Sequence, residues 1–368
     1  MEGAADNAPL TIARQGWFYV GGSYGADAPD GAANMSGHMS GQMYVEYQIP
    51  HIQTCPFPIV MIHGGQQNGT NWTGTPDGRE GWAQYFLRRG YAVYVVDQVA
   101  RGRSAHNAPD AHGALAPLNR DFADRRFIRP EDSVDWPQAA LHTQWPGVPH
   151  KGDDAYDQFI ASQAPSLADY AMQQRLNSTA CIALLDRIGK SIVMVHSQSG
   201  AFGWVIADQR PQLVAALVAL EPNGPPVRDV NNIGAPDWFE DTGRWKVSGL
   251  GDVQLTWEPP LRDGETLAWT REDAPQRKDC VRCWRQGASA RRLPNLAQVK
   301  IMMLTADASY HAPYDHCTAQ FLQQAGVVVD HVYLADHGIT GTGHMLMIEK
   351  TSDAVAGVVH KWLKQNLV

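Results

Sequence analysis

The amino-acid sequence predicts an α/β fold built on a mostly parallel β-sheet flanked by helices. Short runs of apolar and β-branched residues alternate along the chain with longer segments of helical character. Three of these runs stop abruptly at polar or glycine-rich turns, after residues 62, 96 and 196. Strand, helix and strand at this spacing are typical of parallel strands joined by crossover helices.

The elements follow in order from these runs and their stop signals. Gly90 and Gly189 each come directly after a helical segment and end it, because glycine tolerates the backbone conformation found there. The expected strands cover 17–20 and 43–48 at a sheet edge, then 59–62, 91–96, 191–196, 213–220, 299–304 and 327–334, and the expected helices cover 82–89, 168–188, 201–208 and 352–367.

Two long segments, 105–168 and 223–296, interrupt this alternation and show little periodicity. Both start on the side of the sheet where strands end, which is where insertions usually form a lid or a pocket wall. We therefore predict a single domain over residues 1–368, in which the two insertions form a cap over the active site.

Charge and composition narrow the class of partner. The chain carries a net charge of −8, and hydrophobic residues make up 44% of it. A negative chain without a basic run disfavours nucleic acid or an anionic membrane surface as the main partner. No apolar run is long enough to span a membrane. The first residues lack signal-peptide features, so we expect a cytoplasmic protein or, alternatively, a mature secreted form. A small-molecule substrate is the expected partner, and a homodimer is left open.

The five cysteines do not form an even set. An odd count argues against a complete disulfide framework. Cys280 and Cys283 form a CxxC pair, which alone cannot complete a four-ligand structural zinc site, so we predict no metal. A local disulfide and two free thiols remain equal alternatives for this pair.

The segment 191–200 contains the main chemical signal. An apolar strand stops at His196, a serine follows, and helix-forming residues resume at Ala201. A strand, a tight turn and a helix expose the serine hydroxyl at the apex, as in a nucleophile elbow. Ser197 follows the strand directly and is the expected nucleophile. Ser199, two residues further, is the alternative but would already lie inside the helix.

A serine hydroxyl becomes a good nucleophile only when an oriented base removes its proton. His344 lies in a glycine-rich loop after the last strand and is the expected base, with His337 as its rival. Two acids end neighbouring strands. Asp307 is favoured by spacing alone, and Glu221 is the competitor.

Two backbone N–H groups must face the developing negative charge. Gln198 directly follows the nucleophile and supplies one of them. Gly65 ends a His-Gly-Gly turn after a buried strand and supplies the other, since glycine permits a close backbone approach. The remaining histidines near these motifs, His63 and His196, are interpreted as structural.

These residues together resemble those of the α/β-hydrolase family. More narrowly, they resemble a small group of atypical bacterial esterases with a serine–glutamate–histidine triad, typified by esterase 713, and their fungal relatives. The likeness covers most of the chain outside the insertions. The pieces that carry it are 43–50, 75–78, 97–104, 196–200, 221–222 and 343–345.

The resemblance implies a triad of Ser197, Glu221 and His344, and it leaves Asp307 as the alternative acid. It also marks two departures. The bacterial group has adjacent cysteines after the turn that here contains Gly65, so the unusual disulfide of that group is not expected. The segment 223–296 is also longer than its counterpart there.

The function expected from these residues is a cofactor-free serine hydrolase that cleaves a carboxylic ester or lactone through an acyl-enzyme. One alternative is C–C bond hydrolysis or another acyl transfer by the same triad. Another is a catalytically inactive fold that only binds a ligand. The substrate is expected to be bulky and apolar, and the candidate pocket residues are four tryptophans, Trp72, Trp136, Trp145 and Trp204.

Overall fold

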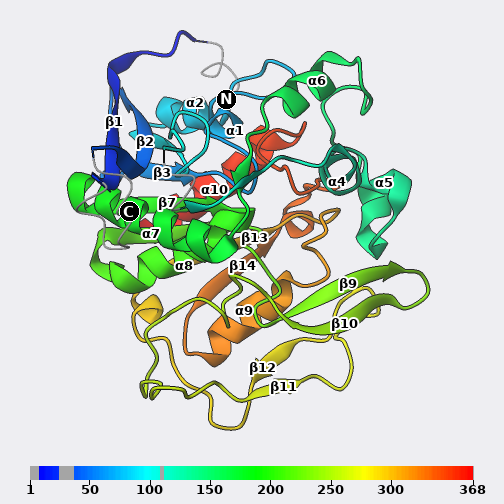
Figure 1. Cartoon of the computed structure of the whole chain (residues 1–368). Helices are drawn as coiled ribbons and strands as arrows, with labels where there is room; N and C mark the ends of the chain where they lie inside the picture. Colours follow the sequence, from blue (N-terminus) through cyan, green and yellow to red (C-terminus); the bar gives the residue numbers. More distant parts are fainter. Residues whose placement is uncertain (1–7, 25–36, 108–111, 368) are drawn as a thin grey trace.

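The structure is a computed structural model that describes residues 8–24, 37–107 and 112–367. Eight strands form one sheet in the order β1-β2-β4-β3-β7-β8-β13-β14 (Figure 1). The pairs β1–β2 and β2–β4 are antiparallel and the other five pairs are parallel, which confirms the predicted fold class. The sheet strands are β1 (Ile12–Tyr24), β2 (Met39–Pro50), β3 (Ile59–Ile62), β4 (Val93–Asp97), β7 (Ser191–His196), β8 (Val214–Leu220), β13 (Ile301–Thr305) and β14 (Val329–Tyr333).

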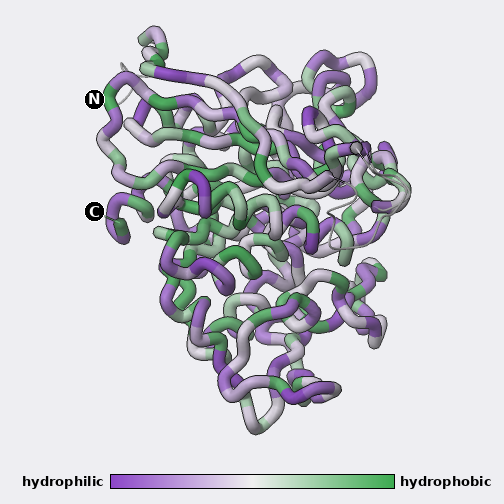
Figure 2. Tube along the Cα trace, turned by 60° about the vertical axis from the view of Figure 1, so that its left-hand side comes forward, coloured by the Kyte–Doolittle hydropathy of each residue, from purple (hydrophilic) through white to green (hydrophobic). Residues whose placement is uncertain are grey.

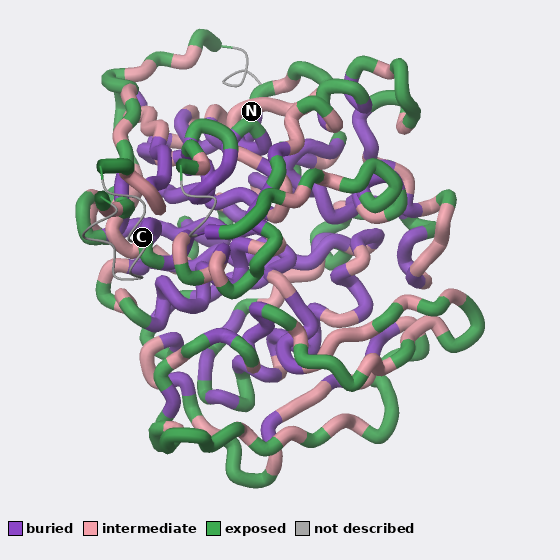
Figure 3. The backbone as a smooth tube through the Cα atoms, viewed as in Figure 1, coloured by how far each residue is buried: buried purple, intermediate pink, exposed green. Residues whose placement is uncertain are grey.

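Helices cover both faces of the sheet, and the strand side chains alternate between them. In β3, Val60 and Ile62 belong to one hydrophobic core, and Ile59 and Met61 to the other. The hydropathy tube and the burial colouring place apolar, buried chain at the centre (Figures 2 and 3). The first core packs against α7 (Tyr170–Ile188) and α8 (Gly200–Gln209), and the second against α2 (Trp82–Arg88) and α10 (Ser352–Leu367).

Two features of the sheet differ from the sequence prediction. The strand expected at 43–48 lies inside the sheet, because β2 pairs with β4 as well as with β1. Helix α9 (Asp315–Gln324) was not predicted. Its sequence carries polar residues on almost every turn, and several of them, such as Asp315 and Thr318, are buried by the segments that pack around the helix.

The first insertion, 105–168, folds into short elements near the carboxyl ends of the strands, at the upper right of Figure 1. Between α4 and α5 it contains one turn of π-helix, η2 (Asp124–Ile128). With α1 (Thr70–Thr73) from the preceding loop, its elements are β5 (Leu115–Ala116), α4 (Arg120–Ala123), α5 (Pro130–Ser133), η3 (Pro137–Leu141), α6 (Asp154–Ala161) and β6 (Ser166–Leu167).

The second insertion, 223–296, forms two hairpins that lie around α9 at the bottom of Figure 1. Much of this insertion is exposed, as the green outer segments in Figure 3 show. The hairpin strands are β9 (Arg228–Gly234) with β10 (Trp238–Trp245), and β11 (Trp269–Arg271) with β12 (Trp284–Gln286); the short 3-10 turns elsewhere are η4 (Ser197–Ser199), η5 (Pro211–Leu213), η6 (Leu296–Gln298) and η7 (Leu334–His337).

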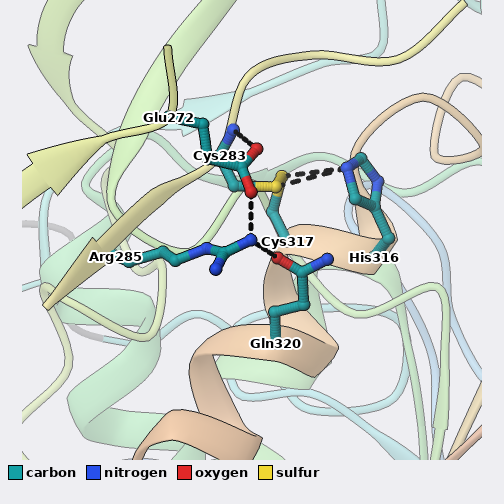
Figure 4. Close-up of a disulfide and its surroundings, with 6 residues drawn as sticks. All are labelled: Glu272, Cys283, Arg285, His316, Cys317 and Gln320. Atoms are coloured by element: carbon teal, nitrogen blue, oxygen red, sulfur yellow. Dashed lines mark hydrogen bonds and ion pairs between the residues drawn. A yellow bond between two sulfur atoms is a disulfide. The ribbon is translucent and has the colours of Figure 1, made fainter. Parts of the chain in front are cut away.

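A disulfide joins the second insertion to α9. Cys283 bonds to Cys317, 34 residues away (Figure 4). Cys280 keeps a free thiol. Both alternatives considered for the CxxC pair are therefore wrong. The Cys280 thiol lies beside its neighbour Asp279. The α9 cysteine could not be identified as the partner from spacing, because the helix itself was not predicted.

Candidate active site

Ser197 lies at the apex of a strained turn between β7 and α8. Its φ is 55°, in the left-handed region that non-glycine residues rarely adopt. Glu221, at the end of the neighbouring strand β8, also has a positive φ of 44°. The backbone N–H of Asn223 donates to the Ser197 carbonyl at 2.8 Å and so ties these two turns together. This is the strained geometry that the elbow motif requires.

Two glycines in α8 make room for the elbow. A Cβ on Gly200 would lie 2.5 Å from Cβ of Pro222, so only glycine fits where the two turns meet. A Cβ on Gly203 would lie 3.1 Å from both methyl groups of Val195. Val195 occupies a position where elbow motifs prefer a small residue, and Gly203 supplies the missing space from the helix side.

Ser199, the alternative nucleophile, has a structural role. It is fully buried, and its Oγ lies 2.9 Å from the carbonyl oxygens of Ile62 and His196. The backbone N–H of His196 donates to the same Oγ at 2.9 Å. These hydrogen bonds hold the hydroxyl against the backbone of two strands. The partly exposed Ser197 is the serine that a substrate can reach.

Glu221 and His344 meet at the carboxyl edge of the sheet. Nδ1 of His344 lies 2.5 Å from Oε2 of Glu221, and both side chains are buried. The Ser309 hydroxyl donates to the same carboxylate at 2.7 Å, and the Ala306 N–H donates at 2.8 Å. The carboxylate is thus fully engaged and orients the imidazole ring.

Burial shapes the ionisation of this pair. Burial is the largest cause that lowers the pKa of His344 well below its usual value, and the charges of His196, His311 and Arg126 lower it further. Burial also raises the pKa of Glu221, which Asp315 raises further and the hydrogen bonds from Ser309 and Ala306 oppose. Burial therefore disfavours the charged form of both partners, and the hydrogen bonds to Glu221 oppose this effect on the carboxylate.

Asp307 and His337 lie outside this arrangement. The Asp307 carboxylate accepts the backbone N–H groups of Gly341 at 3.0 Å and Thr342 at 3.2 Å, and so holds the loop that carries His344. His337 is exposed in η7. Of the two candidate acids, the structure brings only Glu221 to the histidine.

Tyr310 contacts the other side of His344 and was not singled out from the sequence. Its hydroxyl lies 3.2 Å from Nε2 of His344, and its ring centroid lies 4.6 Å from the imidazole. Burial raises the pKa of Tyr310, and a hydrogen bond with the Ser197 side chain partly offsets this rise. The Tyr310 hydroxyl therefore lies close to both the Ser197 side chain and Nε2 of His344.

Gly65 lies close to Gln198, the other residue predicted for the oxyanion hole. A Cβ on Gly65 would lie 3.6 Å from the Gln198 side chain. The buried Arg101 stabilises both turns, because it donates to the Gly64 carbonyl at 2.7 Å and to Oε1 of Gln198 at 2.7 Å. Burial lowers the pKa of Arg101 to about 9.

Arg101 belongs to the turn from Asp97 to Ser104. The Asp97 carboxylate accepts the backbone N–H groups of Gly69 and Arg103, and the Ser104 hydroxyl donates to the Asp97 carbonyl. This agrees with a structural role for the turn. Arg101 itself carried no distinguishing sequence signal, since arginines in loops are usually exposed.

The four tryptophans do not form one pocket. Trp72 and Trp145 belong to one hydrophobic core and Trp204 to the other, with at most 4% of each exposed. This corrects their assignment to a substrate pocket, because the burial of such large apolar side chains stabilises the fold. Trp136 alone lies beside the site, since its ring is 6.0 Å from that of Tyr310 and its indole N–H donates to the Ala308 carbonyl.

Within the described part of the chain, two groups of side chains have the spacing of a metal site. One consists of Glu221, His311 and His344. There Glu221 and His344 bond to each other, and Nδ1 of His311 pairs with Asp315 at 2.9 Å. The other group is the disulfide with its neighbour His316.

A separate cleft of about 440 Å³ lies between residues 70–78 and α6 and includes none of the proposed catalytic residues.

Comparison with known proteins identifies the family. The model of the alpha/beta hydrolase fold matches residues 58–315. The chain belongs to the α/β-hydrolase family. It is also 39% identical over 349 residues to a probable secreted lipase, phiG, from a fungal species (strain ATCC 74256), a match that covers 95% of this chain and 89% of the relative.

The fold of this hydrolase also resembles solved structures. A structure described as that of a novel bacterial esterase superposes with a TM-score of 0.61 at 23% identity, covering 98% of each chain. The predicted fold and the predicted family resemblance are confirmed by these matches. Among the described residues, no helix is both long enough and apolar enough to span a bilayer.

Proposed function

We propose that this protein hydrolyses a carboxylic ester or lactone through an acyl-enzyme formed on Ser197. The observation that carries the proposal is the hydrogen bond between Nδ1 of His344 and Glu221, next to a serine in a strained elbow. The fungal relative named as a lipase and the bacterial esterase with the same fold support ester cleavage.

In the proposed mechanism, Ser197 Oγ attacks the substrate carbonyl while Nε2 of His344 receives its proton. Glu221 stabilises the imidazolium that forms. The backbone N–H groups of Gly65 and Gln198 stabilise the negative charge on the carbonyl oxygen. The imidazolium then protonates the leaving alcohol, and water repeats the sequence to release the acid. No step requires a cofactor.

The two insertions, 105–168 and 223–296, are proposed as a cap over this site, and the contacts of the first insertion support this. The Phe127 ring stacks on His344 with centroids 5.5 Å apart. The Thr143 N–H donates to the carbonyl of Gly341 in the catalytic loop. His142 lies between Glu131 and Glu349, and these contacts raise its pKa to about 9 although burial lowers it. The proposed cap is therefore anchored to the loop that carries His344.

A secreted form is proposed over a cytoplasmic one. The fungal relative is named as secreted, and the disulfide between Cys283 and Cys317 is typical of proteins that mature in an oxidising compartment.

The test of the function uses a fluorophosphonate probe and a panel of aryl esters, lactones and C–C hydrolase substrates. The wild-type protein should be labelled at Ser197 and should cleave esters or lactones. A protein that is neither labelled nor active on the panel would contradict the proposal and favour a ligand-binding role. Cleavage limited to the C–C substrates would keep the triad but replace the substrate class.

A further inference from the structure

The π-helical turn η2 brings two consecutive residues to the catalytic groups. Phe127 stacks on His344, and the Arg126 guanidinium lies 4.7 Å from the ring centroid of Tyr310. The Tyr310 hydroxyl is 3.2 Å from Nε2 of His344. The Tyr310 side chain thus contacts both the Arg126 guanidinium and Nε2 of His344, the proposed proton acceptor. An inserted π-turn is frequent at functional sites, because it re-aims side chains on a short helix.

The arginines around Arg126 have carboxylate partners. Arg125 pairs with Asp135, and Arg129 pairs with Asp124 and Asp132. Arg126 makes no ion pair with any carboxylate in residues 8–24, 37–107 or 112–367. Its neighbours among the described residues include two aromatic rings, those of Tyr310 at 4.7 Å and Phe122 at 5.6 Å from the guanidinium.

A half-buried guanidinium without a carboxylate is unusual in a chain with more acidic than basic residues. Its N–H groups form a planar fork that matches a carboxylate. The aromatic ring beneath it fixes its plane while leaving the edge that carries these donors unpaired. The geometry points to a substrate that carries a carboxylate close to its scissile ester, bound by Arg126; this inference rests on the proposed ester hydrolysis.

The electrostatics of the site agree with an anionic substrate. The positive charge of Arg126 acts against a proton on His344, after the larger effects of burial and the two neighbouring histidines. Catalysis needs that proton, because the imidazolium must form in the transition state. A substrate carboxylate on Arg126 would neutralise this opposing charge at the moment of reaction. A neutral ester would not.

The competing explanation is that Arg126 offsets the buried acids of the site. Glu221 and Asp315 both act on Tyr310, so a cation above that ring also serves as their counter-charge. This role would affect every substrate alike, whereas carboxylate recognition would affect acidic esters selectively.

The experiment compares two matched pairs of esters. Para-nitrophenyl pentanoate and mono-para-nitrophenyl glutarate differ only in the end of the acyl chain, which is a methyl group or a carboxylate. Phenyl acetate and para-acetoxybenzoate differ by a carboxylate on the alcohol side. For each pair, the ratio of kcat/KM for the acidic ester to that for the neutral ester is measured. This ratio does not depend on the fraction of correctly folded enzyme.

In Arg126→Gln, the ratio should fall at least about tenfold in one of the two pairs, which also tells which half of the substrate carries the acid. Arg126→Lys keeps the charge without the fork and should recover part of this loss. Arg125→Gln is the matched control, an adjacent arginine with its own partner, and should leave both ratios unchanged.

An equal loss on acidic and neutral esters, or unchanged ratios in both pairs, would overturn carboxylate recognition while leaving ester hydrolysis intact. A wild-type protein that is inactive on all four esters and unlabelled at Ser197 would instead defeat the proposed function, and this inference with it.

Discussion

Two clusters of buried side chains in this molecule look alike in composition and differ in what they can do. Glu221, His311 and His344 form one, and Cys283, His316 and Cys317 form the other, each with its candidate ligand atoms within 4.8 Å of one another. In the first, hydrogen bonds between a carboxylate and an imidazole leave Nε2 of His344 directed at Tyr310. In the proposed mechanism this first cluster transfers the proton of Ser197.

In the second cluster the two sulfurs are bonded to each other, and Nε2 of His316 lies 3.2 Å from the sulfur of Cys283 (Figure 4). No group there is left to act as a nucleophile, because a thiolate is required for that. The comparison teaches that residue types alone do not define a site. The pairing within the cluster decides between chemistry and a cross-link.

The largest loss of activity is expected for Ser197→Ala. This variant removes the hydroxyl that the first cluster is proposed to activate. Loss of a triad nucleophile costs on the order of a million-fold in kcat. Ester turnover and circular dichroism are measured together. Retained activity in this variant, combined with loss in Ser199→Ala, would transfer the nucleophile to Ser199.

A second test replaces Glu221, the acid of the first cluster. Glu221→Gln should lower kcat by about ten-thousand-fold, as amide replacement of the triad acid does in serine proteases, because the imidazolium loses its charged partner. Asp307→Asn is the control, since Asp307 holds only the loop backbone, and it should keep appreciable activity. The reverse order of the two kcat values would contradict the glutamate assignment.

Tyr310→Phe removes the hydroxyl that lies 3.2 Å from Nε2 of His344 and keeps the aromatic ring. We expect kcat to fall by roughly tenfold to a hundredfold, a range typical of the weaker proton-transfer contributions, with KM changing less. The Tyr314 ring packs at a tilt against the rings of Tyr310 and His311, so Tyr314→Phe deletes a neighbouring hydroxyl from the same aromatic group. Equal losses in both variants would mean that the ring cluster, and not the Tyr310 hydroxyl, is responsible.

The pH profile tests the burial of the first cluster. In the proposed mechanism the active form of His344 is neutral, so titration of this group lowers activity as pH falls through its pKa, which burial holds well below the usual value. We expect kcat/KM to change little between pH about 8 and about 6, where an ordinary histidine would already titrate. Half-loss of activity near pH 6.5 would show an unshifted base.

The smallest effect on activity is expected at the second cluster. Cys283→Ser combined with Cys317→Ser should change kcat by less than about twofold. The same variant should lose about 3 to 4 kcal/mol of unfolding free energy, because the disulfide closes a 34-residue loop in the unfolded chain. Chemical denaturation measures this loss, with Cys280→Ser as the free-thiol control. A large activity loss without destabilisation would connect the disulfide to catalysis.

The sequence predicted the parts of the molecule that depend on local pattern. Strands β3 and β7 and helix α10 have the predicted bounds, because apolar runs and glycine stops define them locally. The strained turn at Ser197 belongs to the same class. The choice of Glu221 over Asp307 came from resemblance. Both residues follow parallel strands, and only their tertiary contacts show which carboxylate meets His344.

The contributions of the insertions could not be predicted. Arg126 and Phe127 reach the site through a π-turn, which leaves no periodic signal in the sequence. Arg101 is buried by a turn that brings residues 64, 101 and 198 together. Tyr310 follows a strand in a loop, where an aromatic residue has no expected direction. Each of these residues acts through contacts between segments that are distant in the chain.

The close fit of Gly203 against Val195 affects how relatives of this chain can be found. A strict Gly-x-Ser-x-Gly scan misses the elbow at Ser197, because Val195 and Ser199 occupy the two glycine positions, and it matches residues 21–25 in its place. The small residues that the turn needs stand instead at Gly200 and Gly203 on helix α8. A search pattern that accepts a β-branched residue two positions before the serine, and demands glycine three and six positions after it, should collect related sequences that the usual motif rejects.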